Sequence, residues 1–351
     1  MEQAVEKLGA EGVDKILAAA MADPKAMFRF ASDISPPAEP VQDYITEVDA
    51  RRALFDEFRA ICQPYYMDAP NATILALFMV APLSEIRTLL QTIRETRLQP
   101  ARHFAASVPT AILNEPGTPA PSDSVTRGQF SHQVKERDGH ICVFSGMSDP
   151  AAAHIFPFAT SKNRNFAYLN EMLAYFWDSK TSFTWRRMFE SPAITQSAKN
   201  GISMSHQIHF WFDNARFALK PLRETPEGVV VQWHWLKRSI LKPLVYVHPD
   251  HDILLQAGVT DHGQNWGDNL AHRKSGVTIR TGQTFLLRAE KPEDMPSWDL
   301  LEMQWNLLRI AAISGAADVT DDYYYDYTEP DERGYDQTVA AKQRAILAEH
   351  Q

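Results

Sequence analysis

The sequence predicts an α+β fold. Apolar residues make up 44% and charged residues 23% of the 351 residues, values typical of a globular protein with a sizeable core. Segments with helical spacing and segments with strand-like alternation both occur. The sequence has neither a glycine-rich phosphate loop nor a regular alternation of strands and helices, so we expect neither a Rossmann fold nor a barrel.

Composition and punctuation divide the chain into five expected parts. A helical N-terminal region covers residues 1–106, and a proline-rich linker follows at 107–124. The region 125–223 mixes short elements, and a strand-and-helix extension packed on it covers 224–317. An acidic, tyrosine-rich tail covers 318–351.

The N-terminal region is expected to contain two helices. Apolar residues recur at nearly helical spacing between Val41 and Gln63, and Pro64 ends that segment. Ser84, with Glu85 in the first turn, predicts the start of a second helix.

The rest of the chain is expected to contain short strands and three helices. Strands are predicted at 140–144, 151–156, 202–204, 216–219 and 228–236. Helices are predicted at 166–177, 206–212 and 300–313. Ser314-Gly315 is a helix stop that ends the last of these.

The charge is uneven along the chain. The net charge is −9, which is not typical of a protein that coats nucleic acid non-specifically. The stretch from Val125 to Arg223 nevertheless holds 12 basic and 7 acidic residues. Any contact with nucleic acid is therefore expected in this basic third.

Targeting and cysteine patterns favour a soluble protein inside the cell. The first ten residues lack a signal-peptide pattern, and the most apolar run, Ala72 to Leu83, is too short to span a bilayer. The two cysteines, Cys62 and Cys142, exclude a disulfide framework and a Cys-rich zinc knuckle. We expect the nucleus or the cytoplasm, and no membrane partner.

Three motifs in the basic third carry residues suited to hydrolysis. The first spans 137–146 (Arg-Asp-Gly-His-Ile-Cys-Val-Phe-Ser-Gly) and the second 152–157 (Ala-Ala-His-Ile-Phe-Pro). The third spans 200–213 (Asn-Gly-Ile-Ser-Met-Ser-His-Gln-Ile-His-Phe-Trp-Phe-Asp). In chain order they supply a histidine that closes a strand, an asparagine that opens a second strand, and a histidine on the following helix.

These motifs resemble the HNH endonuclease family, whose core is a hairpin and helix called the ββα-metal finger. The resemblance is closest to HNH-domain proteins of filamentous fungi, which share the Ala-His-Ile-x-Pro strand and the Phe-Ala-Leu-Lys-Pro segment found here at 217–221. It extends over 126–317, through the Pro-Ser-Trp-Asp-Leu-Leu block at 296–301. It implies an α+β fold with an HNH-type ββα-metal core.

The resemblance implies hydrolysis of phosphodiester bonds. His154 is then the general base, because a neutral imidazole near pH 7 can take a proton from water. Asn200 anchors the loop and orients that base, and His209 is a metal ligand on the helix. The expected cofactor is one divalent ion, with magnesium or manganese favoured and zinc as the alternative.

One position departs from the family pattern. Many HNH enzymes place a metal-binding Asp, Glu or His directly before the catalytic histidine, where this chain has Ala153. Asp213, four residues after His209, can share its helix face and is the first replacement candidate. Asp149 is the second candidate, and a turn role for Asp213 is the competing interpretation.

The insertion between His154 and Asn200 carries basic residues that can contact phosphates. The candidate substrate-binding residues are Arg164, Lys180, Arg186, Arg187 and Lys199. Trp185 can stack on a base. The alternative for the basic residues is that they form an ordinary solvated surface. The expected partner is nucleic acid, with DNA favoured, and the acidic terminal regions can recruit a protein.

Two other functions stay open on the sequence alone. Ala153 and the net charge of −9 favour a catalytically altered HNH fold that serves as a binding or regulatory module. The same scaffold could carry small-molecule, secondary-metabolite chemistry. The histidine-rich run 248–252 is predicted to be a loop, and Cys142 is predicted to be a small core residue.

Overall fold

The computed structural model describes residues 43–62, 70–96, 123–156, 173–237, 239, 241, 247 and 270–316. Helices and antiparallel sheets are both present, so the predicted α+β class is confirmed. The expected acidic tail, the histidine-rich run 248–252 and Arg164 lie outside the described residues. No helix within the described ranges is long and apolar enough to cross a bilayer.

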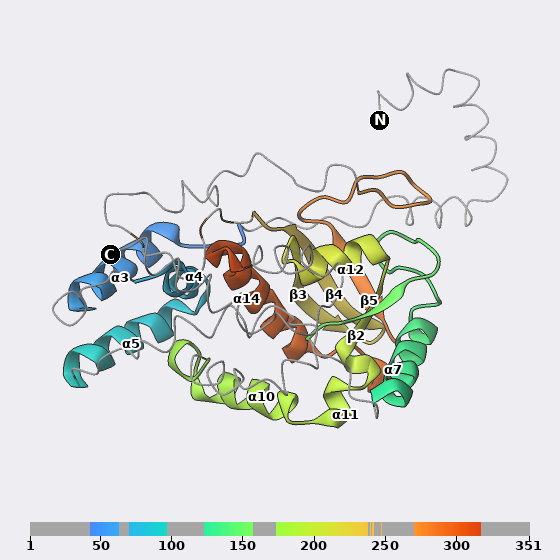
Figure 1. Ribbon diagram of the computed structural model, residues 1–351, viewed down its shortest axis with the longest axis horizontal. Coiled ribbons are helices and arrows are strands. Elements are labelled where there is room, and N and C mark those ends of the chain that lie inside the picture. Colours follow the sequence, from blue (N-terminus) through green and yellow to red (C-terminus); the bar gives the residue numbers. More distant parts are fainter. Residues whose placement is uncertain are drawn as a thin grey trace, which may run out of the picture.

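In the described residues of the N-terminal part there are three helices: α3 (Val48–Cys62), α4 (Ala72–Val80) and α5 (Leu83–Thr96). In Figure 1 they lie at the end of the molecule opposite α7. The predicted helices correspond to α3 and α5, and α4 was not predicted. Almost every residue of α4 is buried, so it lacks the polar face by which a surface helix is recognised.

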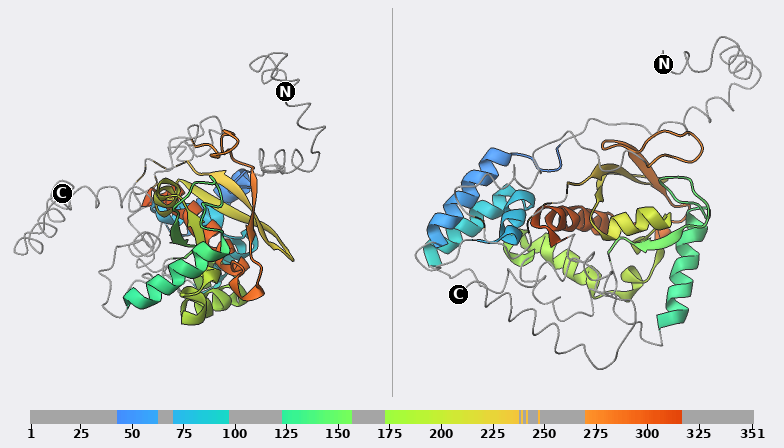
Figure 2. Two further views of the ribbon diagram at one scale, coloured as in Figure 1. Left: turned by 90° about the vertical axis from the view of Figure 1, so that its right-hand side faces the viewer. Right: turned by 45° about the horizontal axis from the view of Figure 1, so that its top comes forward.

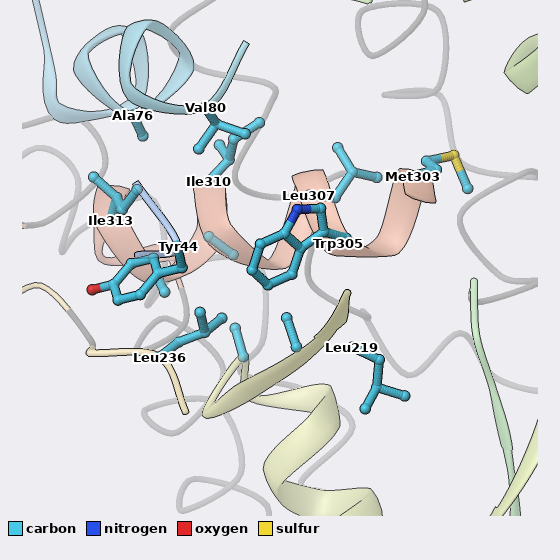
Figure 3. Packing of buried hydrophobic residues seen from close by; sticks show 14 of the residues in the cluster. Tyr44, Ala76, Val80, Leu219, Leu236, Met303, Trp305, Leu307, Ile310 and Ile313 are labelled. Carbon is cyan, nitrogen blue, oxygen red and sulfur yellow. The ribbon is translucent and has the colours of Figure 1, made fainter. Parts of the chain in front are cut away.

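Helix α14 (Trp298–Ser314) forms the centre of the core. It packs against α4 on one side and against β3 (Phe217–Thr225) on another. Figure 3 shows Ile310 of α14 facing Ala76 and Val80 of α4, and Trp305 on the side of the strands. Gly315 ends the helix with a left-handed φ of 76°, as the sequence predicted.

The larger sheet joins β3 to β4 (Gly228–Trp235) and β5 (Thr284–Arg288) in the order β3-β4-β5. Phe217 and Trp233 lie on one face and stack with ring centroids 3.7 Å apart. His234 lies on the other face, where its ring is 4.9 Å from that of Trp305. Because both faces are covered, β4 is buried along its whole length.

A smaller hairpin carries the motif residues. It pairs β1 (Ala151–His154) with β2 (Gly201–Met204), and α12 (His206–Asp213) follows directly. Helix α7 (Asp123–Arg137) packs against both strands. Figure 2 shows α7 at the edge of the molecule, away from α3 and α5.

The described part of the segment between β1 and β2, residues 173–200, is largely helical. It contains α10 (Ser179–Phe189), α11 (Pro192–Thr195) and the 3-10 helix η1 (Ala198–Asn200), and η2 (Pro292–Asp294) lies against η1.

Two predicted elements need correction or lie partly outside the described residues. The strand expected at 140–144 is a turn with one bridge, between Ile141 and Ser148. Of the helix expected at 166–177, only 173–177 is described, and 173–176 is helical. The elements α7, α10 and β5 were not predicted, and α7 begins at Asp123, inside the expected linker.

Candidate active site

His154 lies at the end of β1, opposite Gly201 on β2. Its ring stacks flat on Phe130 of α7, with centroids 4.0 Å apart and an interplanar angle of 4°. Helix α7 can approach this closely because residue 201 has no side chain. A Cβ at Gly201 would overlap Val134 of α7. The backbone of β2 and the face of α7 therefore fix where the His154 imidazole lies.

Asn200 is fully buried and joins the segment after β1 to the segment before β2 by hydrogen bonds. Its Nδ2 donates to the backbone oxygens of Phe156, at 2.8 Å, and Thr195, at 3.0 Å. Its Oδ1 accepts from the Phe156 amide at 2.8 Å, and the Ile155 amide donates to the Asn200 backbone oxygen, also at 2.8 Å. These bonds hold the chain directly after His154.

A buried ion pair supports the same region. The Arg137 Nε and Asp138 Oδ1 are 2.7 Å apart, and their side chains are 3% and 2% exposed. Arg137 also donates to the backbone oxygens of Ala198 and Gly201, at 2.8 and 2.7 Å. Asp138 accepts from the Ser203 amide at 2.8 Å. The first motif thus joins the end of α7 to β2, a role that the sequence showed only as an Arg-Asp pair.

His209 and Asp213 lie one helical turn apart on α12. Their Nε2 and Oδ2 atoms are 3.3 Å apart, and the side chains are 31% and 38% exposed. Partial burial raises the pKa of Asp213, while a positive charge on His209 acts in the opposite direction. The inner face of α12 is instead apolar, with Ile208 and Phe212 buried.

The hairpin has two different faces. Ala153 and Ile202 belong to the main core cluster, which also includes Ile208 of α12. Ala152 packs on the separate small cluster around Phe130 of α7, on the side where His154 stacks. The structure thus brings His209 and Asp213 together, and places His154 against α7.

The His209–Asp213 pair has the spacing of two adjacent ligands of a divalent cation. Two ligands bound about 2.0–2.2 Å from one ion lie about 3 Å apart when they are adjacent in its coordination shell. The separation of 3.3 Å between His209 Nε2 and Asp213 Oδ2 fits that arrangement. Among the described residues no three His, Cys, Asp or Glu side chains converge, so this pair would depend on water or substrate oxygens for the remaining positions. Asp149, the other candidate, is exposed ahead of β1 and has a φ of 57°.

The candidate substrate-binding residues divide into three groups. Lys180, Arg186 and Arg187 are exposed on α10. Lys199 lies half-buried on η1, and Arg164 is outside the described residues. Arg186 pairs with Glu190 on the surface, with Nε and Oε1 3.1 Å apart.

The expected stacking residue, Trp185, is not available to a base. It is 1% exposed and packs on Trp177, with ring centroids 5.6 Å apart. Phe183 of α10 is instead 61% exposed, and the centroid of its ring lies 5.8 Å from the Arg187 guanidinium carbon. Sequence reasoning missed Phe183 because the phase of α10 was not predicted.

Residues 142–220 match the family model described as HNH endonuclease. The match covers β1, β2, α12 and the segment between them, and at the level of the family it indicates nuclease-type hydrolysis of nucleic acid. Comparisons with curated proteins and with solved structures give no match.

Proposed function

We propose that this HNH endonuclease domain hydrolyses phosphodiester bonds of nucleic acid, with DNA as the favoured substrate. The observation that carries the proposal is the anchored end of β1. His154 is fixed there by its stack on Phe130, and the hydrogen bonds of Asn200 hold the chain that follows. A general base needs a defined position relative to the proton that it takes.

The proposed chemistry assigns each side chain one task. The His154 imidazole takes a proton from the attacking water, and Asn200 keeps the backbone behind it in place. His209 and Asp213 would hold the divalent ion. Once bound, that ion would neutralise charge on the phosphate and on the leaving oxygen.

The exposed surface of α10 is proposed to contact a strand of the nucleic acid. Its N-terminal end carries Lys180 beside the capping residue Asp178, which adds to the negative charge around Glu302, whose pKa is raised first by burial and then by nearby Asp299 and Asp178. Its C-terminal turns instead present Arg186 and Arg187. We therefore expect phosphate contacts near the C-terminal end of α10.

One observation favours a second candidate function, a nucleic-acid-binding module without hydrolysis. Ala153, which stands where many HNH enzymes have a metal ligand, is fully buried in an apolar cluster. The described residues therefore offer a cation two strong donors, His209 and Asp213, in place of three.

Cleavage of supercoiled plasmid and of single-stranded DNA separates the two functions. The nuclease proposal predicts nicking with magnesium or manganese that stops with a chelator and in Asp213→Asn. Asp56→Asn serves as the matched control, because Asp56 is an exposed carboxylate on α3, outside the finger. Nucleic-acid binding without cleavage under any metal would contradict hydrolysis and support the binding module.

A further inference from the structure

The segment ahead of β5, residues 270–283, folds back on itself and is called here the basic hairpin. The Ile279 amide donates to the Leu270 oxygen at 2.8 Å, so the two arms run antiparallel. Gly276 turns the chain near the tip with a left-handed φ of 66°. Figures 1 and 2 show this segment, in orange, at the edge of the molecule. The hairpin is therefore a short two-stranded ribbon.

The basic hairpin is anchored at its base and at its tip. At the base, Trp235 Nε1 of β4 donates to the Ile279 oxygen at 2.9 Å. At the tip, the Arg273 amide donates to the Ser145 oxygen at 2.8 Å, in the turn that precedes β1. These bonds give the tip a defined place beside the finger.

The charge of this part of the chain is all of one sign. Residues 270–288 contain four basic residues and no acidic one, although the whole protein has a net charge of −9. All four basic side chains are exposed: Arg273, Lys274, Arg280 and Arg288. The first three belong to the basic hairpin, and Arg288 ends β5.

These cations differ from other exposed arginines in having no carboxylate partner. Arg94 pairs with Glu57 at 2.9 Å, and Arg186 pairs with Glu190 at 3.1 Å. Within the ranges that the structure describes, no ion pair involves a basic residue of 270–288. Their positive charge is therefore not balanced by neighbouring side chains, and it favours an anionic partner.

The position of the tip relates this charge to the finger. Arg273 contacts Ser145 and Ser148, which precede β1, whereas His154 ends that strand. Four strand residues span about 10 Å, and phosphates of one DNA strand follow each other about 3.4 Å apart along the helix axis. The tip is thus placed to contact phosphates a few nucleotides away from a bond held at His154.

We propose that the basic hairpin binds the phosphate backbone of double-stranded DNA beside the bond that is cut, through Arg273, Lys274 and Arg280. A groove of the duplex admits a two-stranded ribbon between its two rows of phosphates. The inference rests on the proposed nucleic-acid substrate and specifies the duplex as its form. The basic hairpin lies outside residues 142–220, so this contact is additional to the segment that matches the family.

Binding of a short labelled duplex to the full-length protein, measured by fluorescence anisotropy with a chelator present, tests the contact at several salt concentrations. The double variant Arg273→Gln/Lys274→Gln should bind about tenfold or more weakly at 0.1 M salt, and the slope of log K against log salt should shrink by about 1–2. Arg280→Gln alone should reduce that slope by about 1.

Arg87→Gln/Arg94→Gln is the matched control. It also removes two exposed charges, but from α5, at the end of the molecule opposite α7. Its affinity and salt slope should stay at the wild-type values. The substituted side chains are all exposed, so the thermal unfolding midpoints should also match, which separates a lost contact from a lost fold.

Wild-type affinity and slope in Arg273→Gln/Lys274→Gln would overturn the proposal and leave the hydrolytic centre untouched, because no cleavage is measured. A loss of affinity confined to a single-stranded probe would overturn the assignment to the duplex. A wild-type protein that binds neither probe would overturn this proposal together with the nucleic-acid substrate on which it rests.

Discussion

Asn200 and Phe156 are joined by two reciprocal hydrogen bonds, each 2.8 Å long, between the Asn200 amide and the Phe156 backbone. These bonds fix the backbone at Phe156, two residues after the predicted base, His154. Asn200 is 0% exposed and therefore cannot itself reach substrate. Its contribution is to hold the chain that follows β1 in position.

Asn200→Ala should destabilise the protein by about 2–3 kcal/mol, because it removes the buried hydrogen bonds of Asn200 to the Phe156 backbone and to the Thr195 oxygen. Urea unfolding measures this loss. Thr88→Ala is the comparison, because the exposed Thr88 hydroxyl donates within α5, to the Ser84 oxygen at 3.0 Å. Equal stability of wild type and Asn200→Ala would contradict the stabilising role of these hydrogen bonds.

The Arg137–Asp138 pair should behave as a buried ion pair. Asp138→Asn is expected to cost about 3–5 kcal/mol, because it leaves the buried Arg137 guanidinium without its countercharge. Glu190→Gln, which breaks the exposed pair with Arg186, should change stability by less than about 1 kcal/mol. Thermal unfolding of the two variants measures the contrast, and similar losses would argue against it.

Trp185 and Phe183 of α10 should separate stability from binding. Trp185→Ala should lower the free energy of unfolding by about 3–5 kcal/mol, since it empties a core position. Phe183→Ala should leave stability within about 0.5 kcal/mol and weaken binding of single-stranded DNA by about 1–3 kcal/mol. Fluorescence anisotropy measures the affinity, and unchanged binding by Phe183→Ala would remove it from the proposed contact surface.

Stability should fall in mild acid because of His234. Burial, reinforced by the charges of Lys220 and Arg309, lowers the pKa of His234 to about 3. Its Nε2 hydrogen bonds to Gln232 Oε1 at 2.9 Å, as a neutral ring can. Below the ordinary histidine pKa of about 6.5, the unfolded chain takes up a proton that the folded protein refuses. This contribution is fully present above that pH, and it is lost by about 1.4 kcal/mol per pH unit as the pH falls toward 3.

Urea unfolding of wild type and His234→Gln between about pH 7 and pH 5 checks this linkage. The free energy of unfolding should fall more steeply with decreasing pH in the wild type than in the variant, because only the unfolded wild type takes up a proton at residue 234. This difference in slope does not depend on the stability of the variant at pH 7. Parallel slopes would show that His234 is not the titrating group.

The sequence predicted elements whose pattern is visible along one segment. β1, β2, α12 and β4 lie where their alternation and punctuation placed them. Helix α4 was not predicted because it is apolar on every side and so shows no helical periodicity. Its residues are buried by contacts with α14 and α3, which lie elsewhere in the chain.

The site was predictable in part. The motif positions of His154, Asn200 and His209 were visible, but their surroundings depend on contacts between distant segments. Phe130 of α7 stacks on His154, and the burial of Trp185 depends on Trp177. Neither relationship follows from spacing within a motif.

The single-turnover cleavage rate of His154→Ala tests the central claim most directly. The account predicts a rate about 10²–10⁴-fold below wild type, with nucleic-acid affinity retained. His206→Ala, an exposed histidine at the start of α12, should cleave at the wild-type rate. A His154→Ala protein that folds, binds and cleaves like wild type would contradict the assignment of His154 as the base and with it the proposed hydrolytic centre.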